Sequence, residues 1–137
     1  MQNSKLIYLL NQQFNREVST LLRYMIEAAA IRSAEQEIVR ATYLKGVSEK
    51  IEHAQYFADQ IVALGGTPIL KSVPVCPSAT VRQMLRWDAA EEQTDEHNCL
   101  ELASEAGKEK LANLKQKLEK QAAIEHERGY EMQCLLW

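Results

Sequence analysis

Glycine and proline are scarce in this sequence: its 137 residues include five glycines and three prolines. From position 3 to position 64, the only residue of either kind is Gly46. Glycine weakens helices through its backbone freedom, and proline breaks them because it lacks an amide hydrogen. Their near absence over such long stretches predicts long helices, and a content of 46% hydrophobic residues fits a helical protein with one core. We expect a single domain over residues 1–137.

Long apolar runs are also missing. No stretch approaches the roughly 18 apolar residues of a transmembrane helix, and the first segment, MQNSKLIYLLNQQFNREV, turns polar too early for a signal peptide. We therefore expect no membrane partner and a cytoplasmic location. The three cysteines, Cys76, Cys99 and Cys134, are odd in number and far apart, which argues against a disulfide scaffold and predicts reduced, partly buried thiols.

Clusters of positive charge are absent as well. The formal net charge is −3 with a pI of about 5.7, and no segment is rich in lysine and arginine. Proteins that bind nucleic acids without sequence preference need such clusters, because these displace the counterions of the phosphates. The sequence therefore predicts no nucleic-acid partner.

Four helices are predicted from the positions of glycine, proline and capping residues. They should run from Ser4 to Ile31, from Ala34 to Leu64, from an N-cap at Ser78 (with Thr80 close behind) to Gly107, and on to Leu136. Short links make the first and second helices, and the third and fourth, antiparallel hairpins. The link between the second and third helices holds all three prolines and is long enough to cross the bundle. This order predicts an all-α, antiparallel four-helix bundle with one long crossover.

Each predicted helix carries ionisable residues near its middle, on its core face. The steps of three and four residues that define these faces pass through Glu17, Lys50, His53, Glu92, Glu125 and Arg128. An unpaired charge in a core costs several kcal/mol, so these side chains must pair with one another. Glu17 precedes Lys50 by 33 residues, Glu92 precedes Glu125 by 33, and a basic residue follows three positions later in both cases. The spacing indicates two similar hairpins.

Three segments resemble helices of a bacterioferritin subunit: LLNQQFNREVSTLLRYMIEA the first, KIEHAQYFADQIVALGGTP the second, and MLRWDAAEEQTDEHNCLELA the third. The resemblance covers nearly the whole chain and implies the ferritin-like fold. It also implies a core site for two irons, held by one Glu from each of two helices and a Glu-x-x-His from each of the other two. Open coordination positions at such a site allow ferrous iron to be oxidised.

Mapped by motif, the resemblance assigns four metal ligands: Glu17, His53, Glu92 and Glu125. Lys50 stands where the second helix should carry its bridging Glu, and Arg128 stands where the fourth should carry its His. Two cationic side chains can replace two metal ions in a buried salt-bridge network. We expect this cluster to bind iron or another divalent metal at no more than one ion per chain, or none. An intact two-iron centre stays the alternative.

Other residues complete the expectations for the site. Ile51 occupies the place of the haem-ligating Met of bacterioferritins, which predicts that no haem binds. His97, His126 and Glu49 lie off the core lines, and we expect both imidazoles to be exposed. Tyr24 and Tyr43 are either redox tyrosines beside a metal or core aromatics whose hydroxyls are hydrogen-bonded.

A second apolar stripe predicts an assembly. Residues that lie beside the core line of the second helix form it, together with Leu22 and Ile26 of the first: Leu44, Val47, Ile51, Ala54, Ala58 and Val62. We expect a homodimer through the first and second helices. The chain ends at CLLW, without the fifth helix of bacterioferritins, which favours a small assembly over a large shell.

Three functions are compatible with these patterns. The first is an iron-handling, ferritin-like protein with weak or no ferroxidase activity, because salt bridges replace part of its dinuclear site. The second is an active di-iron ferroxidase or iron-storage subunit. The third is a non-catalytic helical bundle with a structural role or an unknown protein partner.

Overall fold

The computed structural model describes residues 3–71 and 80–136. These form four long helices, α1 (Ser4–Ala30), α2 (Glu37–Ala63), α3 (Val81–Lys108) and α4 (Ala112–Cys134), with a short 3-10 turn, η1 (Ala34–Gln36), before α2. The boundaries lie within a few residues of those predicted. Ser78, one of the expected caps, lies outside the described residues, as does Cys76. None of the described helices is long and apolar enough to cross a membrane.

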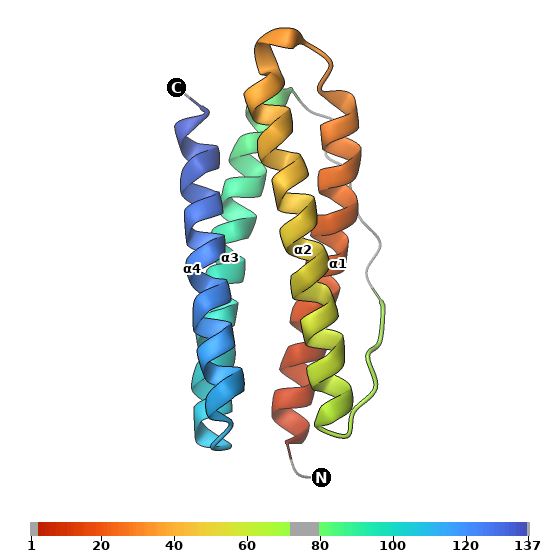
Figure 1. The fold of residues 1–137 in the computed structure, drawn as a ribbon, viewed down its shortest axis with the longest axis vertical. Helices are drawn as coiled ribbons and strands as arrows, with labels where there is room; N and C mark the ends of the chain where they lie inside the picture. The colour runs from red at the N-terminus through yellow and green to blue at the C-terminus, as the bar shows by residue number, and fades with distance from the viewer. Residues whose placement is uncertain (1–2, 72–79, 137) are drawn as a thin grey trace.

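The helices pack as two antiparallel hairpins, α1 with α2 and α3 with α4 (Figure 1). The hairpins contact each other through α1 and α3 and, less closely, through α2 and α4. The connection from α2 to α3 leaves the lower end of α2, and α3 begins at the opposite, upper end of the bundle, so α2 and α3 are joined across its length. This confirms the predicted four-helix bundle with one long crossover.

Local signals set the ends of the two helices that the crossover joins. After α2, Gly65 adopts a left-handed conformation with φ of 90°. Its amide donates to Val62 O, and the amide of Gly66 donates to Ile61 O, a pattern that glycine favours at helix ends. At the start of α3, the hydroxyl of Thr80 accepts from the amide of Gln83, whose side chain accepts from the amide of Thr80.

Two asparagines of α1 hold the first part of the crossover. Asn11 donates to Thr67 O at 3.1 Å and accepts from the amide of Ile69 at 2.9 Å. One turn further on, Asn15 donates to Ile69 O and accepts from the amide of Lys71, both at 2.6 Å. The two side-chain amides thus form hydrogen bonds with backbone groups of Thr67, Ile69 and Lys71, which have no neighbouring strand to bond to in the described part of the chain.

The apolar core is divided into two parts. One lies toward the lower end of the bundle and includes Leu10, Phe57, Ile61 and Leu118. The other includes Tyr24, Tyr43, Leu85 and Met132. Buried polar and charged side chains of all four helices lie along the same core lines, among them Glu17, Lys50, Glu92 and Glu125. These residues form the candidate site.

Candidate metal site and buried charge cluster

Lys50 lies at the centre of the buried charges. Its side chain is 2% exposed, and its ammonium Nζ lies 3.2 Å from Glu17 Oε2 and 3.1 Å from Glu92 Oε1. A third carboxylate, Asp95, has its Oδ2 at 3.8 Å. Lys50 belongs to α2, Glu17 to α1 and the other two acids to α3, so one ammonium joins both hairpins. The prediction that Lys50 pairs with the core carboxylates is confirmed.

The ammonium and the carboxylates shift one another's pKa values. Burial lowers the pKa of Lys50, but the surrounding carboxylates, led by Glu17, raise it more, and it ends well above its ordinary value. For Glu17, burial acts to raise the pKa, but the Lys50 ammonium outweighs it and the pKa falls below the ordinary value. Burial raises the pKa of Glu92 and of Asp95 despite Lys50. Of these three carboxylates, only Glu17 thus has a pKa that the Lys50 ammonium lowers overall.

Asp95 is a member of the cluster that the sequence reasoning missed. Its carboxylate is fully buried and accepts from Arg16 Nε at 2.6 Å and from Gln13 Nε2 at 3.0 Å. The signal was present, because Asp95 lies three residues after Glu92 and four before Cys99 on the core face of the same helix. The core face predicted for that helix contained Glu92 and Cys99 but not Asp95.

Arg128 does not join the central carboxylates, and that part of the prediction is wrong. Its side chain is 3% exposed, but its guanidinium turns to Glu49 of α2 and to Glu131 of its own helix. Nε of Arg128 donates to Glu49 Oε1 at 3.1 Å, and Nη1 donates to Glu131 Oε2 at 2.6 Å. An arginine is long enough to reach these half-exposed acids, which cost less to pair than fully buried ones.

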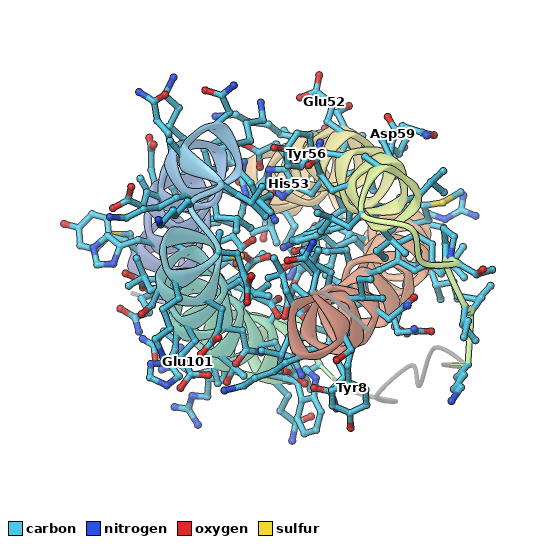
Figure 2. All side chains as sticks on the ribbon, turned by 90° about the horizontal axis from the view of Figure 1, so that it is seen from below. Tyr8, Glu52, His53, Tyr56, Asp59 and Glu101 are labelled. Carbon is cyan, nitrogen blue, oxygen red and sulfur yellow. The ribbon has the colours of Figure 1, made fainter. Side chains whose placement is uncertain are left out.

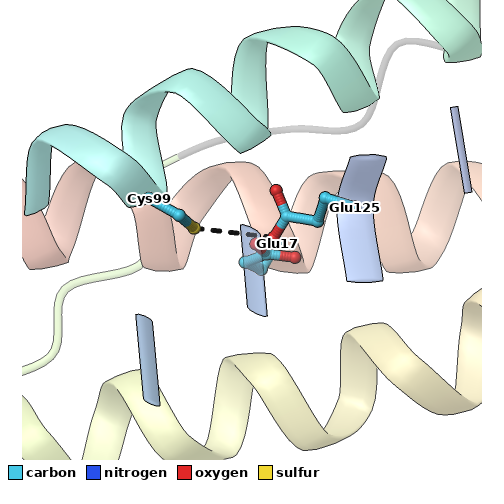
Figure 3. A group of neighbouring side chains, drawn as sticks. All are labelled: Glu17, Cys99 and Glu125. Atoms are coloured by element: carbon cyan, nitrogen blue, oxygen red, sulfur yellow. Dashed lines mark hydrogen bonds between the residues drawn. The ribbon is translucent and has the colours of Figure 1, made fainter. Parts of the chain in front are cut away.

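The other half of the site contains His53, Glu125, Gln121 and Cys99. Figure 2 shows His53 on the inner side of α2, whereas Glu52 and Asp59 lie on its outer side. His53 Nδ1 lies 3.9 Å from Glu17 Oε2 and 3.8 Å from Glu125 Oε1. Figure 3 shows the side chains of Glu17, Cys99 and Glu125 meeting, with Cys99 Sγ 3.6 Å from Glu125 Oε1. Burial and then the charge of Glu17 raise the pKa of Glu125 well above its ordinary value.

A second group of buried charges lies next to the first. Tyr24 donates to Glu92 Oε1 at 2.5 Å, and Tyr43 donates to Asp88 Oδ2 at 2.7 Å. Both tyrosines are fully buried, which confirms that they are core aromatics with hydrogen-bonded hydroxyls. Asp88 also accepts from Arg23 Nε at 2.9 Å.

The residues that were placed off the core lines lie on the surface. His97 and His126 are exposed, as predicted, and pair with Glu101 and Glu96 respectively. Ile51 is 53% exposed and therefore faces outward from α2. Ala54, assigned to the outer apolar stripe, is instead buried, because it lies four residues after Lys50 and three before Phe57, both on the inner face.

The geometry brings the four predicted ligands, Glu17, His53, Glu92 and Glu125, to one place together with Lys50. Two buried groups of side chains there offer ligand atoms: Glu17, Cys99 and Glu125, and Glu92, Asp95 and Glu125. Lys50 contacts Glu17 and Glu92 at ion-pair distance, so its ammonium lies where a cation would bind them. A second divalent ion there would meet a like charge that is buried with it. On the other side, His53 Nδ1 and Glu125 Oε2 are buried and have no hydrogen-bond partner among the described residues. This half fits one cation.

Comparison with known proteins agrees with the fold. A crystal structure of ferritin-like, diiron-carboxylate proteins from Bacillus anthracis str. Ames is similar, with a TM-score of 0.91, 27% sequence identity, and coverage of 97% of this chain and 96% of that chain. Among curated protein sequences, none matches this chain significantly. The sequence profile of the ferritin-like domain matches residues 7–137. This chain therefore belongs to the ferritin-like family.

Proposed function

We propose that this protein is a ferritin-like bundle of the iron-handling lineage that binds at most one divalent metal ion per chain and has little or no ferroxidase activity. The observation that carries the proposal is the position of Lys50 Nζ, at 3.2 Å from Glu17 and 3.1 Å from Glu92. A fixed internal cation satisfies the carboxylates that would otherwise need a second ion. Oxidation of ferrous iron at a paired site needs both ions, and Lys50 leaves room for one.

The remaining half-site supports one bound ion. Glu17, His53 and Glu125 supply oxygen and nitrogen donors, and atoms of His53 and Glu125 lack partners in the folded protein. The similar protein from Bacillus anthracis is described as diiron-carboxylate. For this chain we propose the same lineage, with the ammonium group of Lys50 in the position of one of the two ions. A purely structural bundle is the second candidate, favoured by the ion pairs that Lys50 already makes without metal.

Metal loading of the wild-type protein and of Lys50→Glu tests the proposal. Wild type loaded aerobically with ferrous iron should contain one iron per chain or fewer by elemental analysis, and should oxidise ferrous iron no faster than buffer. Lys50→Glu restores the bridging carboxylate and removes the ammonium, so it should bind more metal and gain more thermal stability from it. The exposed Lys45→Glu, on the same helix, is the control. Two irons per wild-type chain, with the spectrum of an oxo-bridged pair, would refute the proposal.

We also propose that the protein is a homodimer through α1 and α2 and that it binds no haem. Exposed apolar side chains on these helices support the dimer: Leu22, Ile26, Leu44, Ile51 and Val62. Exposed apolar groups on neighbouring helices are typical of an interface. Ile51 offers no lone pair for haem iron, so protein produced with ample haem should show no Soret band.

A further inference from the structure

Cys99 lies against the half-site of Glu17, His53 and Glu125, for which we propose one metal ion. Its side chain is 0% exposed, and its Sγ lies 3.6 Å from Glu125 Oε1. Glu17, Cys99 and Glu125 each offer a ligand atom, and these atoms lie within 4.8 Å of one another (Figure 3). His53 Nδ1 approaches the same carboxylates at 3.8 and 3.9 Å. Donors from three helices, α1, α3 and α4, therefore converge, and His53 of α2 approaches two of them.

The distances suit a tetrahedral ion. Zinc binds sulfur at about 2.3 Å, and nitrogen and oxygen at about 2.0 to 2.2 Å, so neighbouring ligand atoms lie roughly 3.3 to 3.7 Å apart. The separations from Cys99 to Glu125 (3.6 Å) and from His53 to Glu125 (3.8 Å) and Glu17 (3.9 Å) are close to these values. His53 lies outside the group of ligand atoms that are within 4.8 Å of one another, so its imidazole has to move inward to complete a tetrahedron.

Buried donors in this group lack partners. His53 is 6% exposed and Glu125 is 1% exposed, yet His53 Nδ1 and Glu125 Oε2 accept or donate no hydrogen bond among the described residues. A buried polar atom without a partner costs about 1 to 3 kcal/mol. Two such atoms beside a thiol and a second carboxylate indicate a ligand that binds between them.

The amide of Gln121 now takes the place of that ligand. Its Nε2 donates to Glu17 Oε1 and to Glu125 Oε1, both at 3.2 Å, and to Cys99 Sγ at 3.6 Å. The same three side chains thus already surround one positively polarised group. Gln121 and His53 also line a groove of about 600 Å³ between α2 and α4, so the groove borders the site.

We infer that Cys99, with Glu17, His53 and Glu125, forms a mixed sulfur, nitrogen and oxygen site that takes Zn²⁺ in preference to Fe²⁺. The inference rests on the proposed function, since it names the chemistry of the single ion. A thiolate is a soft ligand, and tetrahedral sites containing sulfur favour zinc, which also binds more tightly than ferrous iron to a given set of donors. On binding, the thiol releases its proton to solvent as the sulfur–metal bond forms, and no oxidant or reductant is consumed.

Titration of the reduced, metal-free protein with Co²⁺, a spectroscopic substitute for Zn²⁺, tests the inference. Wild type should bind one Co²⁺ with the near-ultraviolet charge-transfer band of a cobalt–thiolate bond, and Zn²⁺ should abolish the band. Cys99→Ser should lose the band and weaken Co²⁺ binding by roughly 10- to 100-fold. Cys76→Ser and Cys134→Ser, the matched controls, should keep it. Gln121→Ala should bind Co²⁺ more tightly, because it removes the competing amide.

The possible outcomes distinguish a failure of the zinc site from a failure of the proposed function. Wild type that binds one Co²⁺ without the thiolate band, or Cys99→Ser that keeps the band, overturns the role of Cys99 and leaves the limit of one metal per chain intact. Wild type that takes up no Co²⁺ or Zn²⁺ likewise overturns the zinc site. Two ions per chain overturn the proposed function itself. The spectrum of wild type alone shows whether a thiolate binds the metal, so the test does not depend on the folding of any variant.

Discussion

Arg128 of α4 and Glu49 of α2 form an ion pair that connects the two hairpins, with Arg128 Nε 3.1 Å from Glu49 Oε1. Contacts between α2 and α4 are otherwise few, so this pair stabilises the looser side of the bundle. A double-mutant cycle with Arg128→Met and Glu49→Gln, measured by urea unfolding, should give a coupling energy of about 1 to 3 kcal/mol. The same cycle with Glu131→Gln should give less, because Glu131 lies on the same helix as Arg128. A coupling near zero for Glu49 would show that the pair is not formed in solution.

Removal of the Lys50 ammonium should destabilise the fold strongly. Lys50→Met keeps the length of the side chain but leaves Glu17, Glu92 and Asp95 without their shared cation. The loss of one partner from a buried ion pair costs about 3 to 5 kcal/mol, and urea unfolding at neutral pH should show a decrease of this size. Lys45→Met, at a side chain that is 62% exposed, should change the free energy of unfolding by less than about 1 kcal/mol. Equal effects of the two substitutions would contradict the assignment of Lys50.

Glu27 should make the protein less stable as pH rises. The residue is fully buried beside Arg23 and Asp88, and burial, followed by the hydrogen bond and the charge of Asp88, raises its pKa to about 9. An unfolded glutamate has a pKa of about 4.3, so between these values the folded state holds a proton that the unfolded state has lost. Stability from this group is therefore full below about pH 4 and falls by up to about 1.4 kcal/mol per pH unit until about pH 9.

Glu27→Gln tests this slope. The amide resembles the protonated acid, so the variant should lose part of the decline in the free energy of unfolding between about pH 6 and about pH 8.5. Glu37→Gln, at an exposed position, should keep the wild-type slope. If Glu27→Gln and wild type decline in parallel, Glu27 is ionised in the folded protein at neutral pH.

Ile51→Glu should convert the proposed dimer to monomers. The side chain is 53% exposed on α2, and a carboxylate there would be buried without a partner in a dimer formed through α1 and α2. Light scattering coupled to gel filtration should show half the mass of wild type. Leu100→Glu, at a side chain that is 47% exposed on α3, should leave the mass unchanged. A wild-type monomer, or a large cage, would refute the dimer.

The sequence predicted the helices and the core faces well, because both depend on local spacing. The steps of three and four residues identified the buried residues of α4, including Leu118, Gln121, Glu125 and Met132. Lys50 could be placed in the centre of the cluster because it is the only lysine or arginine on its core line, and a lysine pointing inward has to reach acids on other helices.

The partners of each charge could not be predicted in the same way. Arg128 lies on a core line, yet its long side chain reaches Glu49, and only the relative rotation of α2 and α4 decides between Glu49 and the central acids. The contacts of Gln121 with Glu17 and Cys99 depend in the same way on how α4 is rotated relative to α1 and α3. The asparagine contacts to the crossover were missed because they join a helix surface to a segment without periodicity.

The division into two hairpins also has a consequence for how the protein assembles itself. Contacts within a hairpin are close in sequence and form early, whereas the cluster around Lys50 needs both hairpins and forms late. Until then, Glu92, Asp95 and Glu125 lie together on the inner face of the second hairpin, a surface that repels further negative charge. Lys50 brings a complementary charge from the first hairpin, and so we expect its pairing with Glu92 and Asp95 to favour docking of the two hairpins. The residue whose ammonium pairs with Glu17 and Glu92 is therefore also expected to guide the association of the two halves of the chain.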